Sequence, residues 1–154
     1  MILWLEDRKE SVSLYKGICE NNFGLTVKMV SNEGDFYGFL KNNSKDISLI
    51  IIDIMLYGVK NLNNIDITDS DTDSGKEAGW IVIEKILRTK EKIKEPYAKI
   101  PIIILTTLDF YEEDKKRLQD LSRFSRENDL PEIKYFEKNM QRTDFADYLK
   151  SIDL

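Results

Sequence analysis

The segment from Leu49 to Leu56, LIIIDIML, decides the fold. Four apolar residues precede Asp53 and three follow it, which is typical of a strand covered on both faces in a parallel sheet. An ionised aspartate inside such a strand is costly unless it is paired, so we expect Asp53 to lie at the end of the strand. Open α/β sheets place their sites at the carboxyl ends of strands, which makes Asp53 a site candidate. A helix cap or a salt-bridged structural aspartate is the alternative.

The pattern on either side of this segment alternates between strands and helices. Apolar runs predict strands over 1–5, 25–30, 47–54, 99–107 and 132–138. Helical spacing of apolar residues predicts helices over 7–24, 32–46, 80–93, 111–128 and 143–152. Five strand–helix repeats predict an α/β fold, a doubly wound five-stranded parallel sheet with helices on both faces, of flavodoxin-like type.

The length and composition predict one soluble domain over residues 1–154, with an extended acidic loop at about 57–78. Apolar residues make up 42% and charged residues 33%, as in ordinary globular proteins. No apolar run approaches the ~20 residues that span a bilayer, and the first residues do not resemble a signal peptide. We therefore expect a cytoplasmic protein with no membrane contact.

Several classes of chemistry are excluded by what the sequence lacks. There is no histidine, and Cys19 is the only cysteine, so neither His-based catalysis nor a conventional zinc site is available. The net charge of −5 argues against direct nucleic-acid binding. The basic residues of RTKEKIKE, 88–95, alternate with acids, so we interpret this stretch as a solvated helix end.

Acidic and polar residues end several of the predicted strands. Glu6 and Asp7 follow the first, Asp53 ends the third, Thr106 the fourth and Lys138 the fifth. In a doubly wound sheet these ends open onto one edge. Neighbouring carboxylates repel unless a hard cation lies among them, which predicts a Mg²⁺ site. A carboxylate beside a metal, a hydroxyl and a lysine also suits a phosphoryl acceptor.

At this point the sequence resembles the CheY-like receiver domain of two-component response regulators. The resemblance is carried by MILWLEDR (1–8), LIIIDIML (49–56), PIIILTT (101–107) and KYFEK (134–138), in the family's order over nearly the whole chain. It implies that Asp53 accepts a phosphoryl group from a sensor histidine kinase or a phosphotransfer protein. It also implies a signalling domain rather than an enzyme acting on a separate substrate, and we expect this domain to be stand-alone because the chain ends soon after the fifth predicted helix.

The resemblance assigns a role to each of the other residues. Glu6, Asp7, Asp53 and the backbone carbonyl of Met55 would hold Mg²⁺. Thr106 and Lys138 would bind phosphoryl oxygens, and Tyr135 would be the aromatic switch residue that moves with Thr106. The changed surface would dock a downstream protein partner, and a homodimer could form through the face of 111–128, 132–138 and 143–152. Each residue also has a plainer role as a cap, strand or surface residue.

The sequence departs from the family at several positions. Asn139 follows the lysine where a cis proline is usual, and Glu137 precedes it in place of an apolar residue. Thr107 replaces a smaller residue. The alternating Asp69, Asp71 and Asp73 suggest a calcium loop, but Ser74 and Trp80 occupy the positions that need Gly and Glu. A solvated acidic loop is the preferred interpretation.

Two other functions stay open from the sequence. The chain could be a degenerate receiver-like interaction module that takes no phosphate, with its altered loops serving constitutive binding. A Mg²⁺-dependent phosphohydrolase is less favoured, because that class usually has a second aspartate two residues after the nucleophile and Met55 stands there.

Overall fold

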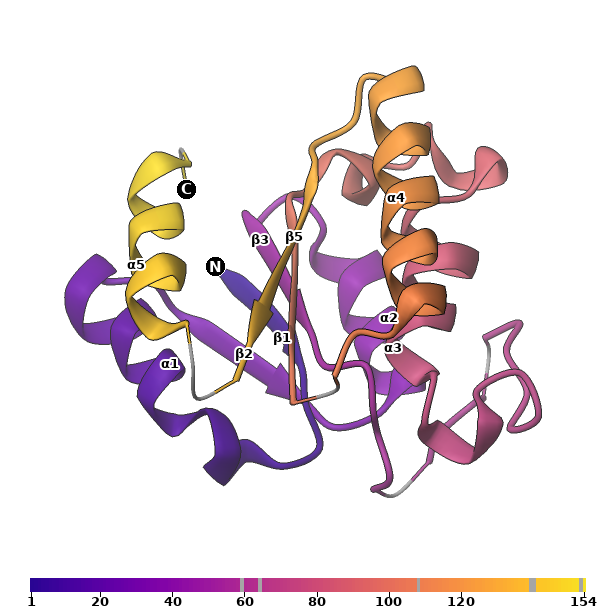
Figure 1. Ribbon diagram of the computed structural model, residues 1–154, viewed down its shortest axis with the longest axis horizontal. Helices are drawn as coiled ribbons and strands as arrows, with labels where there is room; N and C mark the ends of the chain where they lie inside the picture. Colours follow the sequence, from indigo (N-terminus) through magenta and orange to yellow (C-terminus); the bar gives the residue numbers. More distant parts are fainter. Residues whose placement is uncertain (59, 64, 108, 139–140, 153) are drawn as a thin grey trace.

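The computed structural model describes residues 1–154 except 59, 64, 108, 139–140 and 153 (Figure 1). Its five strands are β1 (Ile2–Leu5), β2 (Val27–Val30), β3 (Leu49–Ile52), β4 (Ile102–Thr106) and β5 (Ile133–Glu137). They form one sheet in the order β2-β1-β3-β4-β5, and all neighbouring strands are parallel. The predicted doubly wound parallel sheet is confirmed, and β3 is its central strand.

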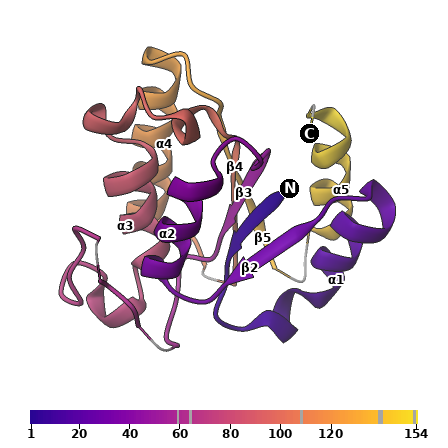
Figure 2. The ribbon, with the colours of Figure 1, turned by 180° about the vertical axis from the view of Figure 1, so that it is seen from behind.

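Helices cover both faces of this sheet. Their bounds are α1 (Ser13–Gly17), preceded by a one-turn helix at Lys9–Val12 and continued by a π turn at Ile18–Asn22, then α2 (Glu33–Asn43), α3 (Ala78–Val82), continued by a π turn at Ile83–Leu87, α4 (Glu112–Glu127) and α5 (Arg142–Ser151). Short helical turns also occur at Asp73–Gly75, Lys90–Lys92 and Pro96–Lys99. Figures 1 and 2 show α1 and α5 on one side of the sheet and α2, α3 and α4 on the other.

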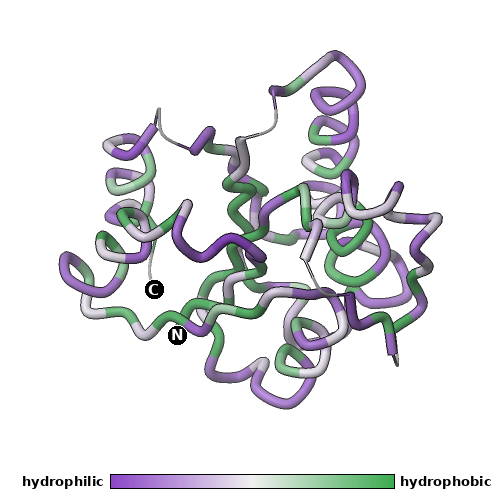
Figure 3. Tube along the Cα trace, turned by 90° about the horizontal axis from the view of Figure 1, so that it is seen from below, coloured by the Kyte–Doolittle hydropathy of each residue, from purple (hydrophilic) through white to green (hydrophobic). Residues whose placement is uncertain are grey.

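Alternate residues of the strands supply two separate cores. Leu3, Leu5, Ile50 and Ile52 belong to the core under α2, α3 and α4. Their neighbours Ile2, Trp4, Leu49 and Ile51 belong to the core under α1 and α5. Both faces are therefore apolar, which explains the unbroken hydrophobic run in the sequence of β3. Figure 3 shows this hydrophobic colour concentrated along the central strands.

The predicted helix over 80–93 is wrong in its second half. After the π turn the chain leaves helical geometry at Arg88, where φ is −131° and ψ is 59°. Arg88 is 3% exposed, so the interpretation of 88–95 as a wholly solvated helix end is also wrong at this residue. Its guanidinium donates hydrogen bonds to the carbonyls of Ala98 (2.8 Å) and Ile100 (3.0 Å), and more weakly to that of Pro131 (3.4 Å).

Arg88→Met is expected to destabilise the fold by about 2 kcal/mol, because hydrogen bonds to a charged donor are lost and buried carbonyls are left unpaired. Burial lowers the pKa of Arg88 to about 10, so the side chain stays charged near neutral pH. Urea unfolding of the variant measures the loss. Arg126→Met, at an exposed site on α4, is the control and should unfold with the parent. Equal midpoints for all three proteins would contradict a structural role for Arg88.

The long segment after β3 begins and ends at neighbouring positions, Leu56 and Gly75. Leu56 N donates to Gly75 O at 2.9 Å, which closes the segment between them. Gly75 has φ +100°, and a Cβ there would lie 1.9 Å from Leu56 O, so only glycine fits. Farther out, Gly34 N of α2 donates to Asn61 O at 2.7 Å. The segment is therefore fastened to the body of the protein at its base and on α2.

Some aspartates of this segment pair with lysines. Asp69 contacts Lys60, and Asp71 contacts Lys85 at 3.2 Å. Asp71 also accepts hydrogen bonds from both the backbone N–H and the hydroxyl of Thr68, and these bonds lower its pKa to about 2. Within the described part of the chain, these aspartates do not gather into a group that could hold a metal. The calcium interpretation gains no support.

Across the described residues, none of the helices combines the length and apolar character needed to cross a membrane.

Candidate functional site

Three carboxylates meet at the carboxyl ends of β1 and β3. Glu6 and Asp7 directly follow β1, and Asp53 directly follows β3, the strand that pairs with it. One carboxylate oxygen from each of the three lies within 4.8 Å of the others. Glu6 is fully buried and Asp53 is 5% exposed. The predicted convergence of these side chains is therefore present in the structure.

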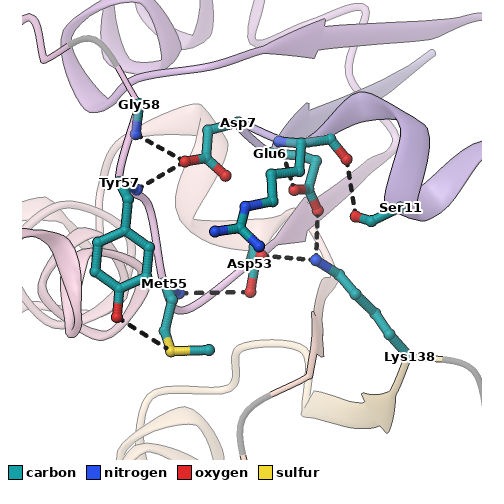
Figure 4. A network of polar contacts seen from close by, with 9 residues as sticks. Glu6, Asp7, Ser11, Asp53, Met55, Tyr57, Gly58 and Lys138 are labelled. Carbon is teal, nitrogen blue, oxygen red and sulfur yellow. Dashed lines mark hydrogen bonds and ion pairs between the residues drawn. The ribbon is translucent and has the colours of Figure 1, made fainter.

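Lys138, which directly follows β5, reaches across this edge to two of the carboxylates. Its Nζ lies 2.6 Å from Glu6 Oε2 and 2.6 Å from Asp53 Oδ2, and its side chain is 3% exposed. Figure 4 shows the lysine pointing between Glu6 and Asp53. Buried charges are tolerated when they are paired, and this lysine supplies the pairing for both acids.

The contact with Lys138 does not fully offset the burial of Glu6 and its closeness to Asp53. The Oε1 atom of Glu6 accepts a hydrogen bond from Arg8 N at 2.8 Å. Burial raises the pKa of Glu6 to about 7, and the nearby Asp53 charge adds to the increase, while Lys138 opposes it. A single lysine therefore does not balance the carboxylates, and the site favours a further cation or a proton.

Asp7 is held by the start of the long segment after β3. Its Oδ2 accepts hydrogen bonds from Tyr57 N and Gly58 N, each at 2.7 Å (Figure 4). A Cβ on Gly58 would lie 3.1 Å from Asp7 Cβ, so a larger residue there would fit only if Asp7 shifted by a few tenths of an ångström. Among the residues described, none donates a hydrogen bond to Asp7 Oδ1, which leaves that oxygen for a cation.

Backbone contacts fix the end of β3 around Asp53. Asp53 N donates to Leu5 O at 3.0 Å, and Gly79 N of α3 donates to Ile54 O at 2.9 Å. A Cβ on Gly79 would lie 2.3 Å from Asp53 O, so α3 can approach the strand only through glycine. Met55 N lies 3.4 Å from Asp53 Oδ1. The metal-binding role of the Met55 carbonyl stays a prediction.

The two threonines at the end of β4 differ in position. Thr106 is fully buried, and its carbonyl accepts a hydrogen bond from Lys138 N at 2.9 Å. Thr107 lines a small hollow of about 70 Å³ beside Asp53 and Lys138. Thr106 is thus held next to the lysine as predicted, and its role toward a phosphoryl group stays a prediction.

Tyr135, the predicted switch residue, lies on β5 opposite Ile104. Its ring stacks on Phe110, with centroids 3.8 Å apart and planes 24° apart. Phe110 in turn packs against Trp80 at 5.6 Å. Burial raises the pKa of Tyr135, so the phenol stays neutral near physiological pH. The sequence alone did not indicate Phe110 or Trp80 as neighbours of Tyr135.

The donor set suits a hard divalent cation. Glu6, Asp7 and Asp53 offer only oxygen, at spacings that allow a shared ion, and Lys138 does not balance their charge. Mg²⁺ prefers carboxylate and water oxygens and commonly keeps several waters. The residues present therefore fit Mg²⁺, with these three carboxylates as its protein ligands. The peptide that follows Lys138, where the sequence lacks the family's proline, lies outside the described residues.

Mg²⁺ affinity is expected to fall when the pH is lowered from about 8 to about 6, because a proton on Glu6 competes with the ion. The raised pKa also means that the metal-free fold loses stability as the pH rises from about 4.5 to about 7. Calorimetric Mg²⁺ titrations at several pH values measure the effect. Glu6→Gln should bind more weakly and lose most of the pH dependence; an unchanged dependence in that variant would contradict the assignment to Glu6.

Comparison with known proteins identifies the fold. No family model matches the chain, and no curated protein matches it in sequence. Solved structures do match over nearly its whole length. The signal receiver domain of the DNA-binding response regulator merR from Colwellia psychrerythraea 34H has a TM-score of 0.64 and 20% identity, covering 97% of this chain and 94% of its own.

Two further solved structures agree. The receiver domain of NtrX from Brucella abortus has a TM-score of 0.58 and 12% identity, covering 98% of this chain and 96% of its own. A CheY-like receiver domain protein from Methanospirillum hungatei JF-1 has a TM-score of 0.56 and 17% identity, covering 97% and 90%. The chain therefore has the CheY-like receiver fold that its sequence motifs predict.

Proposed function

We propose that this chain is a response regulator receiver that takes a phosphoryl group on Asp53 in a Mg²⁺-dependent reaction. The observation that carries the proposal is the arrangement around Asp53, which ends the central strand with Glu6 and Asp7 nearby and Lys138 at 2.6 Å. The receiver fold of the whole chain supports it. The phosphoryl donor would be a sensor histidine kinase or a phosphotransfer protein.

The chemistry follows from the positions of these side chains. A carboxylate oxygen of Asp53 attacks the phosphorus of the donor, and an O–P bond forms as the bond from phosphorus to the leaving group breaks. The electron pair stays with the leaving group, and the product is an acyl phosphate on Asp53. Bound Mg²⁺ would neutralise phosphoryl charge during transfer, which is the main requirement of this reaction.

Lys138 would change partners during the reaction. Its Nζ contacts Asp53 Oδ2 and Glu6 Oε2, and an incoming phosphoryl group brings oxygens that compete with both carboxylates for the ammonium. Thr106 sits beside it, because Thr106 O holds Lys138 N. A shift of Lys138 would therefore displace the ends of β4 and β5, which this hydrogen bond joins.

The output would be a changed surface of this domain. The Phe110–Tyr135 stack joins the β4–α4 connection to β5, next to these strand ends. A displacement of Lys138 and Thr106 would bias this stack and the surface near α4 and β5 between two arrangements. A downstream protein partner would recognise one of them, and a second copy of the chain could use the α4, β5 and α5 face.

Incubation with acetyl phosphate and Mg²⁺, followed by intact mass measurement, tests the proposal. We expect one added phosphoryl group per chain, lost again over time and absent when EDTA removes the metal. A folded, Mg²⁺-binding protein that never gains mass would contradict it, and would favour the phosphate-independent interaction module.

A further inference from the structure

The hollow beside Asp53 is lined by a positively charged side chain, Arg8, that has no role in the proposed function. The volume of the hollow is about 70 Å³, and Arg8 and Ser11 line it together with Asp53, Thr107 and Lys138. Arg8 is exposed, so its side chain faces solvent at the mouth of the hollow. An incoming phosphoryl donor would therefore meet Arg8 before it meets Asp53.

The backbone of Arg8 is fixed next to the carboxylates. Arg8 N donates to Glu6 Oε1 at 2.8 Å, and Arg8 O accepts hydrogen bonds from Ser11 N at 2.9 Å and Ser11 Oγ at 2.8 Å. Figure 4 draws the Ser11 hydroxyl at this edge of the site. These bonds hold the Cα of Arg8 in place while leaving its long side chain able to reach over the hollow.

The guanidinium of Arg8 forms no ion pair with a carboxylate among the described residues, although the acidic residues Asp7 and Glu10 lie near it in the sequence. Two other arginines have protein partners: Arg117 contacts Glu84 at 2.7 Å, and Arg88 donates to buried carbonyls. Arg8 is therefore a cation held at the site without a protein partner there.

The charge of the site indicates what Arg8 would bind. Three carboxylates are balanced by Lys138 and one divalent cation, so a phosphoryl dianion would enter with its charge uncompensated. A guanidinium presents two parallel N–H donors that match phosphoryl oxygens, and it is always charged. Arg8 can therefore supply the missing positive charge from the solvent side.

We propose that Arg8 binds the phosphoryl group of the donor and of phosphorylated Asp53, as a second cation opposite Lys138. This inference deepens the proposed function and depends on it. Arg8 would contact only oxygens of the phosphoryl group. It would therefore favour donors whose phosphoryl oxygens carry a negative charge that no cation of the donor neutralises. It would take no part in holding Mg²⁺.

The test compares Arg8→Met and Arg8→Lys with Lys9→Met, which removes one positive charge from the next, exposed residue. The initial phosphorylation rate is measured against acetyl phosphate concentration at saturating Mg²⁺. Arg8→Met is expected to raise the half-saturating concentration roughly fivefold, since one charge-assisted contact at an exposed site is lost. Arg8→Lys should recover part of the loss, and Lys9→Met should match the parent.

Two binding measurements separate this role from a structural one. Affinity for beryllofluoride, a phosphoryl mimic, should fall with Arg8→Met in the presence of Mg²⁺, whereas affinity for Mg²⁺ alone and the thermal midpoint should not fall. Parent-like kinetics and beryllofluoride binding in Arg8→Met would overturn the inference and leave the proposed function standing. Equal losses in Lys9→Met would also overturn it, as a general charge effect. A parent that takes no phosphate would overturn both.

Discussion

Asp53→Asn is expected to abolish phosphorylation by acetyl phosphate. The amide keeps the shape of the side chain but has no anionic oxygen to attack phosphorus, and the other two carboxylates would be occupied with Mg²⁺. Glu6 would still contact Lys138 at the buried edge, so the fold should persist. Intact mass over a time course measures the result, with circular dichroism to show that the variant is folded.

Asp46→Asn is the matched control for this variant. Asp46 is an exposed aspartate in the turn before β3, at the opposite end of this strand from Asp53. Its substitution by asparagine changes the charge by the same amount. It should gain phosphate at the rate of the parent. Persistent phosphorylation of Asp53→Asn would place the acceptor at another residue and would contradict the account of the site.

Lys138→Met is expected to cost about 3 kcal/mol of folding stability in EDTA, because it leaves two neighbouring carboxylates buried without their shared cation. The Nζ contacts of 2.6 Å to Glu6 and Asp53 are the ones removed. Mg²⁺ should restore part of the loss by supplying positive charge to the same acids. Phosphorylation should also slow strongly, since the buried lysine is a principal cation for the phosphoryl oxygens.

Lys134→Met provides the comparison on the same strand. Lys134 is partly exposed and, among the described residues, its ion pair is with Glu132, so its loss should change unfolding little. Denaturant unfolding measures the free energy of unfolding of both variants, each in EDTA and in Mg²⁺. If Lys138→Met were as stable as Lys134→Met in EDTA, the carboxylates would not depend on Lys138 for their burial.

The fold could be predicted because its main signals are local in the sequence. The apolar run before Asp53 indicates a strand buried on both faces, and β3 is the central strand with cores on either side. Parallel strands then bring their carboxyl ends to one edge, so Glu6, Asp7, Asp53 and Lys138 could be expected to meet. That Lys138 contacts both Glu6 and Asp53 was not predictable from spacing.

Other features depend on contacts between distant residues and could not be read from the sequence. Gly34, Gly75 and Gly79 each allow a backbone approach that a Cβ would block. Arg88 looked like part of a charged surface helix, but its carbonyl partners come from the segments before β4 and β5. The aspartates of the acidic loop are largely exposed, in line with a solvated loop, but their pairing with Lys60 and Lys85 could not be read from the sequence.

The most direct test of the central claim is to locate the phosphoryl group. Borohydride reduces an acyl phosphate on aspartate to the alcohol and releases phosphate, so the modified residue becomes homoserine in a peptide that mass spectrometry can sequence. After treatment with acetyl phosphate and Mg²⁺, we expect homoserine at position 53 and unchanged aspartate at position 7. Homoserine at any other position, or unmodified Asp53 in a protein that has gained phosphate, would contradict it.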